Sequence, residues 1–505
     1  MNYSPLKICL SICITLLIML GITYFSTSIP LENDKFQDGF RVLGYTIKYP
    51  KTTSFLLQEK TKTSKVTTKT VDSIVQNIDV LVEDDEDISV TVEKKEKEEK
   101  EKGKTLKIPN LSQIDTSKIE RLIYPKDKTA FLTHLKTQLT ASKCRIIHYG
   151  DSQIEGDRMS GYIRNRLQNL YGGNGPNFTP IAQVYDNISS EVIASDNWTR
   201  HAVFDRTSKI PDHKMYGAYA TFSRFTPYKN IIKDSINKDS LKLVKAKITV
   251  SPSKKTYLRM RKYTDIGLHY GNTQLPVSVK VFADGMLIKS DSLITDGNYH
   301  NYKIKLANTP DQLTFEIESK MSPDFYGLTL DGESGILLDN VAMRGSAGTL
   351  FAGLNSKNFT QMYKTLDPQV IIFQYGGNAV PYVKDSLEVE HYVGYLKNHI
   401  NWLRRKTNNA SVLYIGPADK TTTENGNMLT YPLLPYLIDR LKLMCKENNI
   451  AYWDTFQAMG GEDSMEYWVN QKLAARDYTH FSLTGTRIIS ELFFLSLYMD
   501  LTSQK

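Results

Sequence analysis

The chain has 505 residues, of which 41% are hydrophobic and 10% aromatic, and its formal net charge is +8. This length and apolar content supply enough core for about two or three domains. The positive charge is spread thinly, and no basic block interleaved with aromatic residues argues for a nucleic-acid partner.

Cysteine usage argues against a disulfide scaffold and a structural metal. Cys9 and Cys13 lie in an N-terminal apolar segment, which leaves Cys144 and Cys445 in the folded body. These two flank strand and helix patterns, so we expect buried free thiols. No cysteine or histidine cluster has the spacing of zinc ligands.

Residues 1–25 read as an export segment. Residues 8–25 are apolar or small and follow Lys7, and the run is about the minimum length that spans a bilayer. Ser26-Thr27-Ser28 is a poor cleavage site, which favours an uncleaved anchor over a cleaved signal peptide. A core helix is the other reading, but nothing amphipathic follows to pack against it. We expect a single-pass membrane protein whose body lies outside the cytoplasm, in the periplasm or the extracellular space.

Residues 26–107 have the composition of a tether. They are rich in Thr, Ser, Lys, Glu and Asp, with an acidic patch at 83–87 and a mixed charge run at 93–102. Such a segment cannot bury enough apolar surface to offset its chain entropy. The charge run could form a solvated helix, and we assign the whole segment to a spacer without chemistry.

The body from residue 108 predicts an α/β domain split by a β insert. A first part, 108–189, contains a helix at 129–142, a strand at 146–149 and a second helix that ends at Gly172. Alternating short runs with turn signals at 190–343 predict an antiparallel β-sandwich, in which no single residue stands out as a ligand contact. Alternation of strands and helices returns near Gly335, and the second part of the α/β domain is 344–505. Its strands (370–375, 412–415 and 451–454) are continuously apolar and predict a parallel sheet covered on both faces.

Small and polar clusters follow the predicted parallel strands. They are Gly150-Asp151-Ser152, Gly376-Gly377-Asn378 and Gly416-Pro417-Ala418-Asp419. Because the carboxyl ends of parallel strands share one edge of a sheet, we expect these clusters to lie together. Each cluster alone is also ordinary turn or cap chemistry.

Asp477-Tyr478-Thr479-His480 precedes the last helix, predicted at 483–499. The spacing of three lets the Asp477 carboxylate hold the His480 ring through one N–H, which leaves the other ring nitrogen to take a proton from a hydroxyl. Taken alone, the same residues could form an N-cap beside a surface histidine.

Together these segments resemble the SGNH (GDSL-type) hydrolase superfamily. Gly150-Asp151-Ser152 matches its first block, 340–348 resembles the second with Gly345 as the match, Gly376-Gly377-Asn378 resembles the third, and Asp477-x-x-His480 matches the fifth. Two departures argue against the lipase-like branch: Gln153 stands where many members have Leu, and Ala379 replaces an aspartate. The β insert adds an architectural likeness to bacterial cell-envelope O-acetylesterases with an inserted carbohydrate-binding module.

The resemblance implies a three-layer, flavodoxin-like α/β fold interrupted by a jelly-roll-like β-sandwich. It implies Ser152 as nucleophile, His480 as base and Asp477 as its orienting acid, with the Ser152 N–H, the Gly345 N–H and the Asn378 amide as oxyanion donors. No cofactor is implied, and the expected substrate is an acylated polysaccharide or peptidoglycan. Two alternatives stay open: an O-acyltransferase that uses the same three residues, and a non-catalytic glycan-binding envelope protein.

Overall fold

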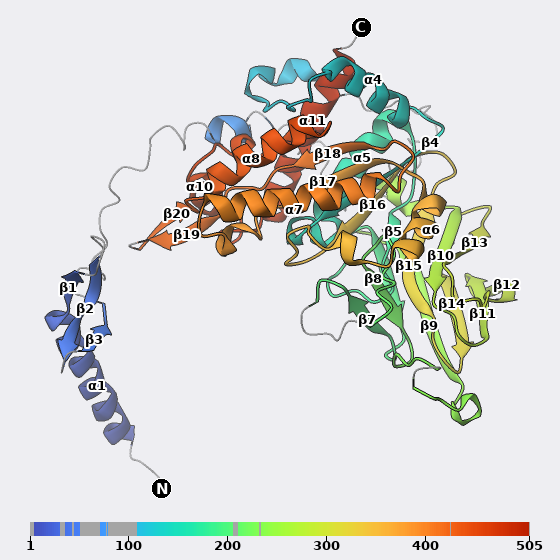
Figure 1. The fold of residues 1–505 in the computed structure, drawn as a ribbon, viewed down its shortest axis with the longest axis horizontal. Coiled ribbons are helices and arrows are strands. Elements are labelled where there is room, and N and C mark those ends of the chain that lie inside the picture. The colour runs from blue at the N-terminus through green and yellow to red at the C-terminus, as the bar shows by residue number, and fades with distance from the viewer. Residues whose placement is uncertain are drawn as a thin grey trace. The chain divides into compact units, whose positions relative to one another are not determined.

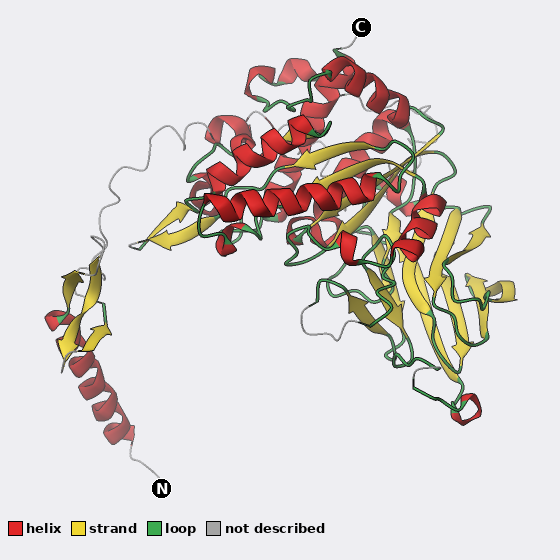
Figure 2. Cartoon of the chain, viewed as in Figure 1, coloured by secondary structure: helices red, strands yellow, loops and turns green. Residues whose placement is uncertain are grey.

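The computed structural model describes residues 5–30, 36–42, 45–50, 71–76, 78, 109–205, 211–231, 234–424 and 426–503. The chain divides into two compact units, an N-terminal unit and a body, which we treat separately. Figures 1 and 2 show their elements. The charge run at 93–102 lies outside the described residues.

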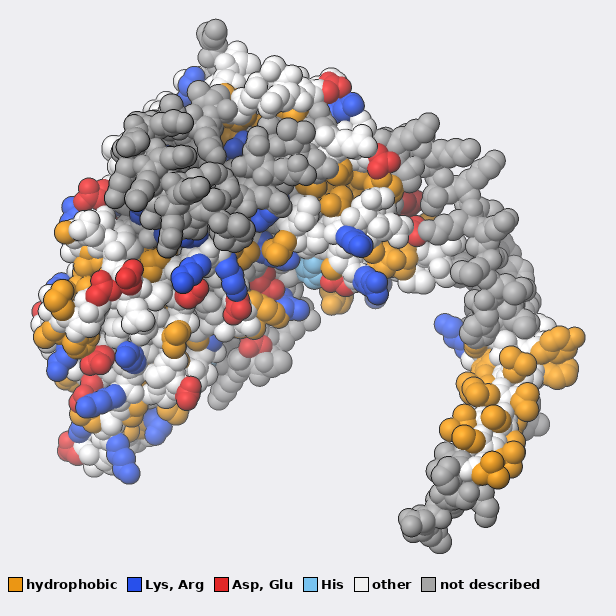
Figure 3. Space-filling model, turned by 180° about the vertical axis from the view of Figure 1, so that it is seen from behind, with side chains coloured by type: hydrophobic (Ala, Val, Ile, Leu, Met, Phe, Trp, Pro, Cys, Tyr) orange, Lys and Arg blue, Asp and Glu red, His pale blue; other side chains and the backbone are white. Residues whose placement is uncertain are grey.

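The N-terminal unit contains helix α1 (Pro5–Phe25) and a small antiparallel sheet of β1 (Thr27–Pro30), β2 (Phe36–Val42) and β3 (Tyr45–Lys48). Hydrophobic side chains gather on the surface of α1 (Figure 3). The sheet corrects the tether prediction for 27–48, because β-prone residues such as Phe40 and Ile47 are locally dense there although the whole segment is polar. Among the helices that the structure describes, none is both long and apolar enough to cross a bilayer.

The body is organised around a five-stranded sheet in which every neighbouring pair is parallel. Its strands, in spatial order, are β16 (Gly335–Ala342), β4 (Lys143–Gly150), β17 (Pro368–Gln374), β18 (Ser411–Ile415) and β21 (Ala451–Trp453). Counted along the chain this is the order 2-1-3-4-5, the flavodoxin-like arrangement we expected. Such a sheet binds ligands where the strand order reverses, here beside the carboxyl end of β4.

Helices cover both faces of this sheet, and each face has its own core. They are α4 (Lys128–Leu139), α5 (Arg158–Tyr171), α6 (Ser356–Leu366), α7 (Ser386–Arg404), α8 (Leu434–Glu447), α9 (Thr455–Ala458), α10 (Ser464–Asn470) and α11 (Leu483–Thr502). Ile146 packs with residues of α4, α5 and α11, whereas Ile147 and Tyr149 pack with residues of α6, α7 and α8. Successive side chains of a strand point to opposite faces, so a strand buried on both faces is mostly apolar, as the sequence predicted, although β4 also buries Arg145 and His148. Cys144 and Cys445 are buried and free, also as predicted.

The insert is a pair of antiparallel sheets that share one core, to which Ile248 and Phe315 contribute from one sheet and Ile266 and Leu328 from the other. The first sheet contains β5 (Asn177–Thr179), β7 (Thr199–Ala202), β8 (Thr221–Arg224), β10 (Asp265–Gly271), β13 (His300–Lys305) and β15 (Asp324–Asp331). The second contains β6 (Ser190–Ala194), β9 (Val244–Pro252), β11 (Val277–Ala283), β12 (Met286–Ser292) and β14 (Leu313–Ser319). A two-stranded hairpin, β19 (Thr421–Glu424) and β20 (Asn427–Thr430), completes the strands.

The boundaries of the insert differ from the predicted 190–343. Strand β5 pairs with β15 and so belongs to the insert, whereas β16 pairs in parallel with β4 and so belongs to the α/β sheet. The three residues of β5 are too short to show an alternation. The apolar run of β16 fits either kind of sheet, because its strand partner decides which one it joins.

A buried ion cluster joins the insert to the parallel sheet. Arg145 on β4 donates from Nη1 to both carboxylate oxygens of Asp339 at 2.7 and 2.8 Å, and its Nη2 contacts Asp331 at the end of β15. Asn177 donates to Asp331 at 3.0 Å and accepts from the Leu338 N–H at 2.8 Å. The insert is therefore fixed to the sheet by charged groups that are more than nine-tenths buried.

Candidate active site

The strand-to-turn junction after β4 presents Ser152. A 3-10 segment, Ser152–Asp157, begins directly after the strand, and the Asp151 side chain caps it by accepting the Gln153 N–H at 2.9 Å. A Cβ at Gly150 would lie 2.9 Å from the Ile154 side chain, so a larger residue here would require Ile154 to move. The turn places Ser152 at the carboxyl edge of the sheet, next to the strand-order reversal.

A second loop brings His480 to the same place. Asp477 Oδ1 accepts the backbone N–H groups of Thr479 and His480, both at 3.0 Å, which folds the loop around the carboxylate. Tyr478 adopts a left-handed conformation with φ of 53° to close this turn. The spacing of three in the sequence is thus a compact turn rather than a helical one.

Ser152, His480 and Asp477 are hydrogen-bonded in series. Ser152 Oγ lies 2.7 Å from His480 Nε2, and His480 Nδ1 lies 2.7 Å from Asp477 Oδ2. A carboxylate only accepts hydrogen bonds, so Nδ1 donates to Asp477 and Nε2 is left to accept the serine hydroxyl. Partial burial of Asp477 opposes ionisation, but hydrogen bonds from the His480 ring and from two backbone N–H groups outweigh it and lower the pKa of the carboxyl. The arrangement can remove a proton from an alcohol, and the chemical roles of the three residues stay predictions.

The predicted oxyanion donors differ in whether they already donate a hydrogen bond to another group of the protein. The N–H groups of Ser152 and Gly345 have no acceptor among the described residues. Asn378 lines the same small cavity as Ser152, but its Nδ2 donates to Asp151 Oδ2 and to the Ser346 carbonyl, each at 3.2 Å. An oxyanion that used all three donors would have to share the Asn378 amide with those long hydrogen bonds. Gly345 has φ of 75°, a conformation that favours glycine.

No protein-family model and no curated protein matches the chain. Among solved structures, a peptidoglycan O-acetylesterase matches with a TM-score of 0.59 at 18% sequence identity, over 76% of this chain and 99% of that protein.

The body has an SGNH hydrolase-like fold.

Two more solved structures match with TM-scores of 0.25 and 12% identity. One is a family two carbohydrate esterase from Clostridium thermocellum in complex with cellohexaose, over 51% of this chain and 92% of that one. The other is a salicylyl-acyltransferase from a tetracycline biosynthetic pathway, over 60% and 95%. Because both scores are low, the SGNH hydrolase-like fold rests on the first match.

The structure adds polar residues around this candidate site whose contacts the sequence did not predict. Gln153 Nε2 donates to the Thr479 carbonyl at 2.6 Å, which ties the serine turn to the histidine loop. Arg158 does the same, donating to the carbonyls of Ser152 at 3.0 Å and Phe481 at 3.2 Å. We call these hydrogen bonds of Gln153 and Arg158 the clamp. In the sequence, only Gln153 hinted at it, because Gln153 departs from the family pattern.

Three charged residues, Asp151, Asp419 and Lys420, also border the small cavity beside Ser152. Lys420 Nζ donates to the Gly377 carbonyl at 3.2 Å. Burial raises the pKa of Asp151 to about 6. The hydrogen bond from the Gln153 N–H and the charges of His480 and Lys420 lower this pKa but do not outweigh burial. Asp419, which ends the third strand cluster, accepts from Thr430 and the Met465 N–H at 2.8 Å each, which gives it a structural role. Among the described residues no group of three or more His, Cys, Asp or Glu side chains could hold a metal ion.

Proposed function

We propose that this protein is an exported serine esterase that removes O-acetyl or similar short acyl groups from cell-envelope or other polysaccharides. The observation that carries the proposal is the hydrogen-bonded series of Ser152, His480 and Asp477, with both hydrogen bonds at 2.7 Å. It stands at the carboxyl edge of a parallel sheet, beside the N–H groups of Ser152 and Gly345, which have no acceptor among the residues that the structure describes. The fold shared with a peptidoglycan O-acetylesterase agrees with it.

In the proposed reaction Ser152 Oγ attacks the ester carbonyl while His480 Nε2 takes the hydroxyl proton. Asp477 stabilises the imidazolium through Nδ1. The tetrahedral oxyanion accepts from the Ser152 and Gly345 N–H groups and from the Asn378 amide. Collapse expels the sugar alkoxide, which takes the proton from His480. Water then attacks the acyl-enzyme with His480 as base, and the free acid and Ser152 are released.

Replacing Ser152 tests the proposal. We expect Ser152→Ala to lower kcat on an acetylated aryl ester and on acetylated polysaccharide by about 1,000-fold or more, because no nucleophile remains. Ser142→Ala is the matched control, since Ser142 is exposed and precedes β4 where Ser152 follows it. Released acetate reports hydrolysis, and acetyl groups on an added sugar acceptor would report transfer. Unreduced turnover by Ser152→Ala would reject the proposal.

Export is proposed from the apolar run at 8–25 and the lysine before it. With this segment intact, we expect the body to be reached by protease added outside the cytoplasmic membrane. Deleting residues 8–25 should leave the body in the cytoplasm. Protection of the body in the full-length chain would contradict export.

A further inference from the structure

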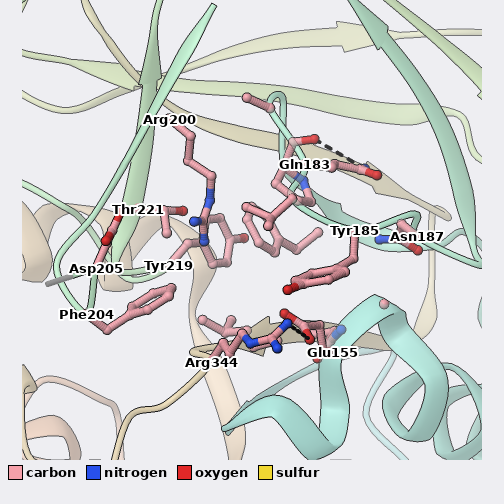
Figure 4. A pocket seen from close by; sticks show the side chains of 18 residues that line it. Glu155, Gln183, Tyr185, Asn187, Arg200, Phe204, Asp205, Tyr219, Thr221 and Arg344 are labelled. Carbon is pink, nitrogen blue, oxygen red and sulfur yellow. Dashed lines mark hydrogen bonds and ion pairs between the residues drawn. The ribbon is translucent and has the colours of Figure 1, made fainter. Parts of the chain in front are cut away.

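A cavity of about 360 Å³ lies between the parallel sheet and the insert (Figure 4). Glu155 and Gly156 line it from the turn after β4, and Arg344 lines it just beyond β16. Asn340, Val341 and Ala342 of β16 line it as well, and its remaining walls come from the insert and from the chain that leads into it. The volume falls at the lower end of the range of small-molecule pockets.

This cavity adjoins the candidate active site along two segments of the chain. The 3-10 segment Ser152–Asp157 carries Ser152 at its start and lines the cavity with Glu155 and Gly156. Arg344, which lines the cavity, directly precedes Gly345, whose N–H has no acceptor within the described part of the chain. A molecule bound here would therefore lie within one short turn of the attacking hydroxyl.

Four aromatic residues line the cavity, and two of them, Tyr185 and Phe204, come from different segments and are less buried than Phe178 and Tyr219 (Figure 4). Tyr185 is 44% exposed, so much of its ring is open to a ligand. Aromatic faces of this kind pack against the apolar C–H face of a sugar ring. No pattern in the sequence distinguishes these two from the many other aromatic residues of the insert.

The two arginines of the cavity differ in their partners. Arg344 lies over the Tyr185 ring at 4.8 Å, and its Nη1 is 3.4 Å from Glu155 Oε2. Arg200, on β7, reaches into the cavity and lies over the Phe204 ring at 5.3 Å (Figure 4). Among the described residues it has no hydrogen-bond or ion-pair partner. Burial lowers the pKa of Arg200, and the nearby charges of Asp205 and Glu155 only oppose this shift.

We propose that this cavity binds a carboxylate-bearing sugar of the acylated polysaccharide, which rests on the proposed esterase function. Arg200 donates two parallel N–H bonds to the carboxylate, the geometry that a guanidinium fork matches best. The sugar ring packs beside Tyr185 and Phe204, and the neighbouring acylated hydroxyl extends toward Ser152. A neutral sugar would fill the same space but could not offer the Arg200 guanidinium a hydrogen-bonded carboxylate, and the charges of Asp205 and Glu155 would only lie near it.

The test uses two oligosaccharides that differ only in charge. An oligosaccharide of hexuronic acids is compared with the same chain after its carboxylates are reduced to alcohols, and both are acetylated chemically. We expect wild-type kcat/KM to be about 10-fold higher or more for the charged chain, as for hydrogen bonds to a charged group. Arg200→Gln should remove this preference, and Arg200→Lys should keep a smaller one. Arg405→Gln is the control, because Arg405 follows α7 and lies at the opposite edge of the sheet.

A binding measurement separates this proposal from the esterase function. Calorimetric titration of Ser152→Ala with the two oligosaccharides, without acetyl groups, needs no turnover. Tighter binding of the charged chain, lost in the Ser152→Ala/Arg200→Gln variant, supports the subsite even if no esterase activity is found. Equal affinity for both chains, or an Arg200→Gln variant with an intact melting transition and an unchanged preference, overturns it. Failure of the esterase function alone would appear as absent Ser152-dependent acetate release.

Discussion

The Gln153→Leu variant tests whether the clamp between the turn that carries Ser152 and the loop that carries His480 is needed for catalytic rate. Gln153 Nε2 lies 2.6 Å from the Thr479 carbonyl, one residue before His480. Leu is the residue that many SGNH hydrolases have at this position, so the side chain should fit. The change removes the donor and leaves the Thr479 carbonyl without it, while the buried Gln153 Oε1, which has no partner among the described residues, disappears as well.

The two effects oppose each other in stability but not in activity. Losing the hydrogen bond to the partly buried Thr479 carbonyl destabilises the fold by about 1–2 kcal/mol. Removing the unsatisfied Gln153 Oε1 stabilises it and offsets part of this loss. The global free energy of unfolding should therefore change by less than about 1 kcal/mol. The histidine loop, however, loses one of its two ties to the serine turn, and a freed loop holds Nε2 less often at 2.7 Å from Ser152 Oγ. A loss of about 1–2 kcal/mol in transition-state stabilisation would lower kcat/KM by about 5- to 30-fold.

The assay is kcat and KM on an acetylated aryl ester, together with a melting curve. We expect the loss to fall on kcat, because a small ester makes few contacts that depend on the clamp. Arg158→Met cuts the second tie, and the double variant should lose more than the two single losses added, since the ties support one loop. Gln312→Leu, at an exposed position of the insert, is the control. Values of kcat within twofold of wild type for Gln153→Leu and for the double variant would refute the clamp.

Three further changes probe the charges around the site and its frame. Asp151→Asn should stabilise the protein above pH 6. Because burial raises the pKa of Asp151 from 3.8 to about 6, ionising this carboxyl costs the folded state about 3 kcal/mol, and Asn avoids that cost. The gain in melting temperature should vanish below about pH 4, where the carboxyl is protonated in both states. A gain that is the same at pH 4 and pH 7 would contradict this. Asn378→Ala should lower kcat about 100-fold with little change in KM, measured on the aryl ester, and a rise in KM alone would remove Asn378 from the oxyanion role. Asp331→Asn leaves buried Arg145 with one carboxylate partner and should cost about 3 kcal/mol in urea unfolding, whereas a cost below 1 kcal/mol would show that Asp339 suffices.

The parallel sheet could be predicted because its signals are local. Continuous apolar runs such as 370–375 fit only a strand buried on both faces once helices alternate with them. The same logic placed the clusters that end at Ser152 and Asn378 on one edge, since parallel strands end together. The register between strands and the identity of each neighbour depend on long-range contacts, which is why β5 and β16 were assigned to the wrong domains.

The meeting of Ser152 with His480 was predicted from family-like blocks, but the contacts that hold it were not. Gln153 to Thr479 and Arg158 to Phe481 join residues more than 300 positions apart, and each is a side chain bonded to a backbone carbonyl. A carbonyl carries no residue identity, so a sequence pattern cannot point to it. Arg200 could not be predicted either, because what singles it out is that it lines the folded cavity without a hydrogen-bond or ion-pair partner among the described residues.

The walls of the cavity beside the site are fixed by the ion cluster at Arg145. Arg145 belongs to β4, whose end carries Ser152, and its partners Asp331 and Asp339 belong to the last strand of the insert and to β16. Moving the insert away from the sheet would expose or separate these buried charges, which is costly because each would lose its partner without gaining full hydration. The distance between Arg200 on the insert and Ser152 on the sheet is therefore set by the fold rather than by domain motion. If the cavity binds a glycan as proposed, its selectivity should respond to single substitutions on the cavity walls and stay insensitive to changes on the far side of the insert.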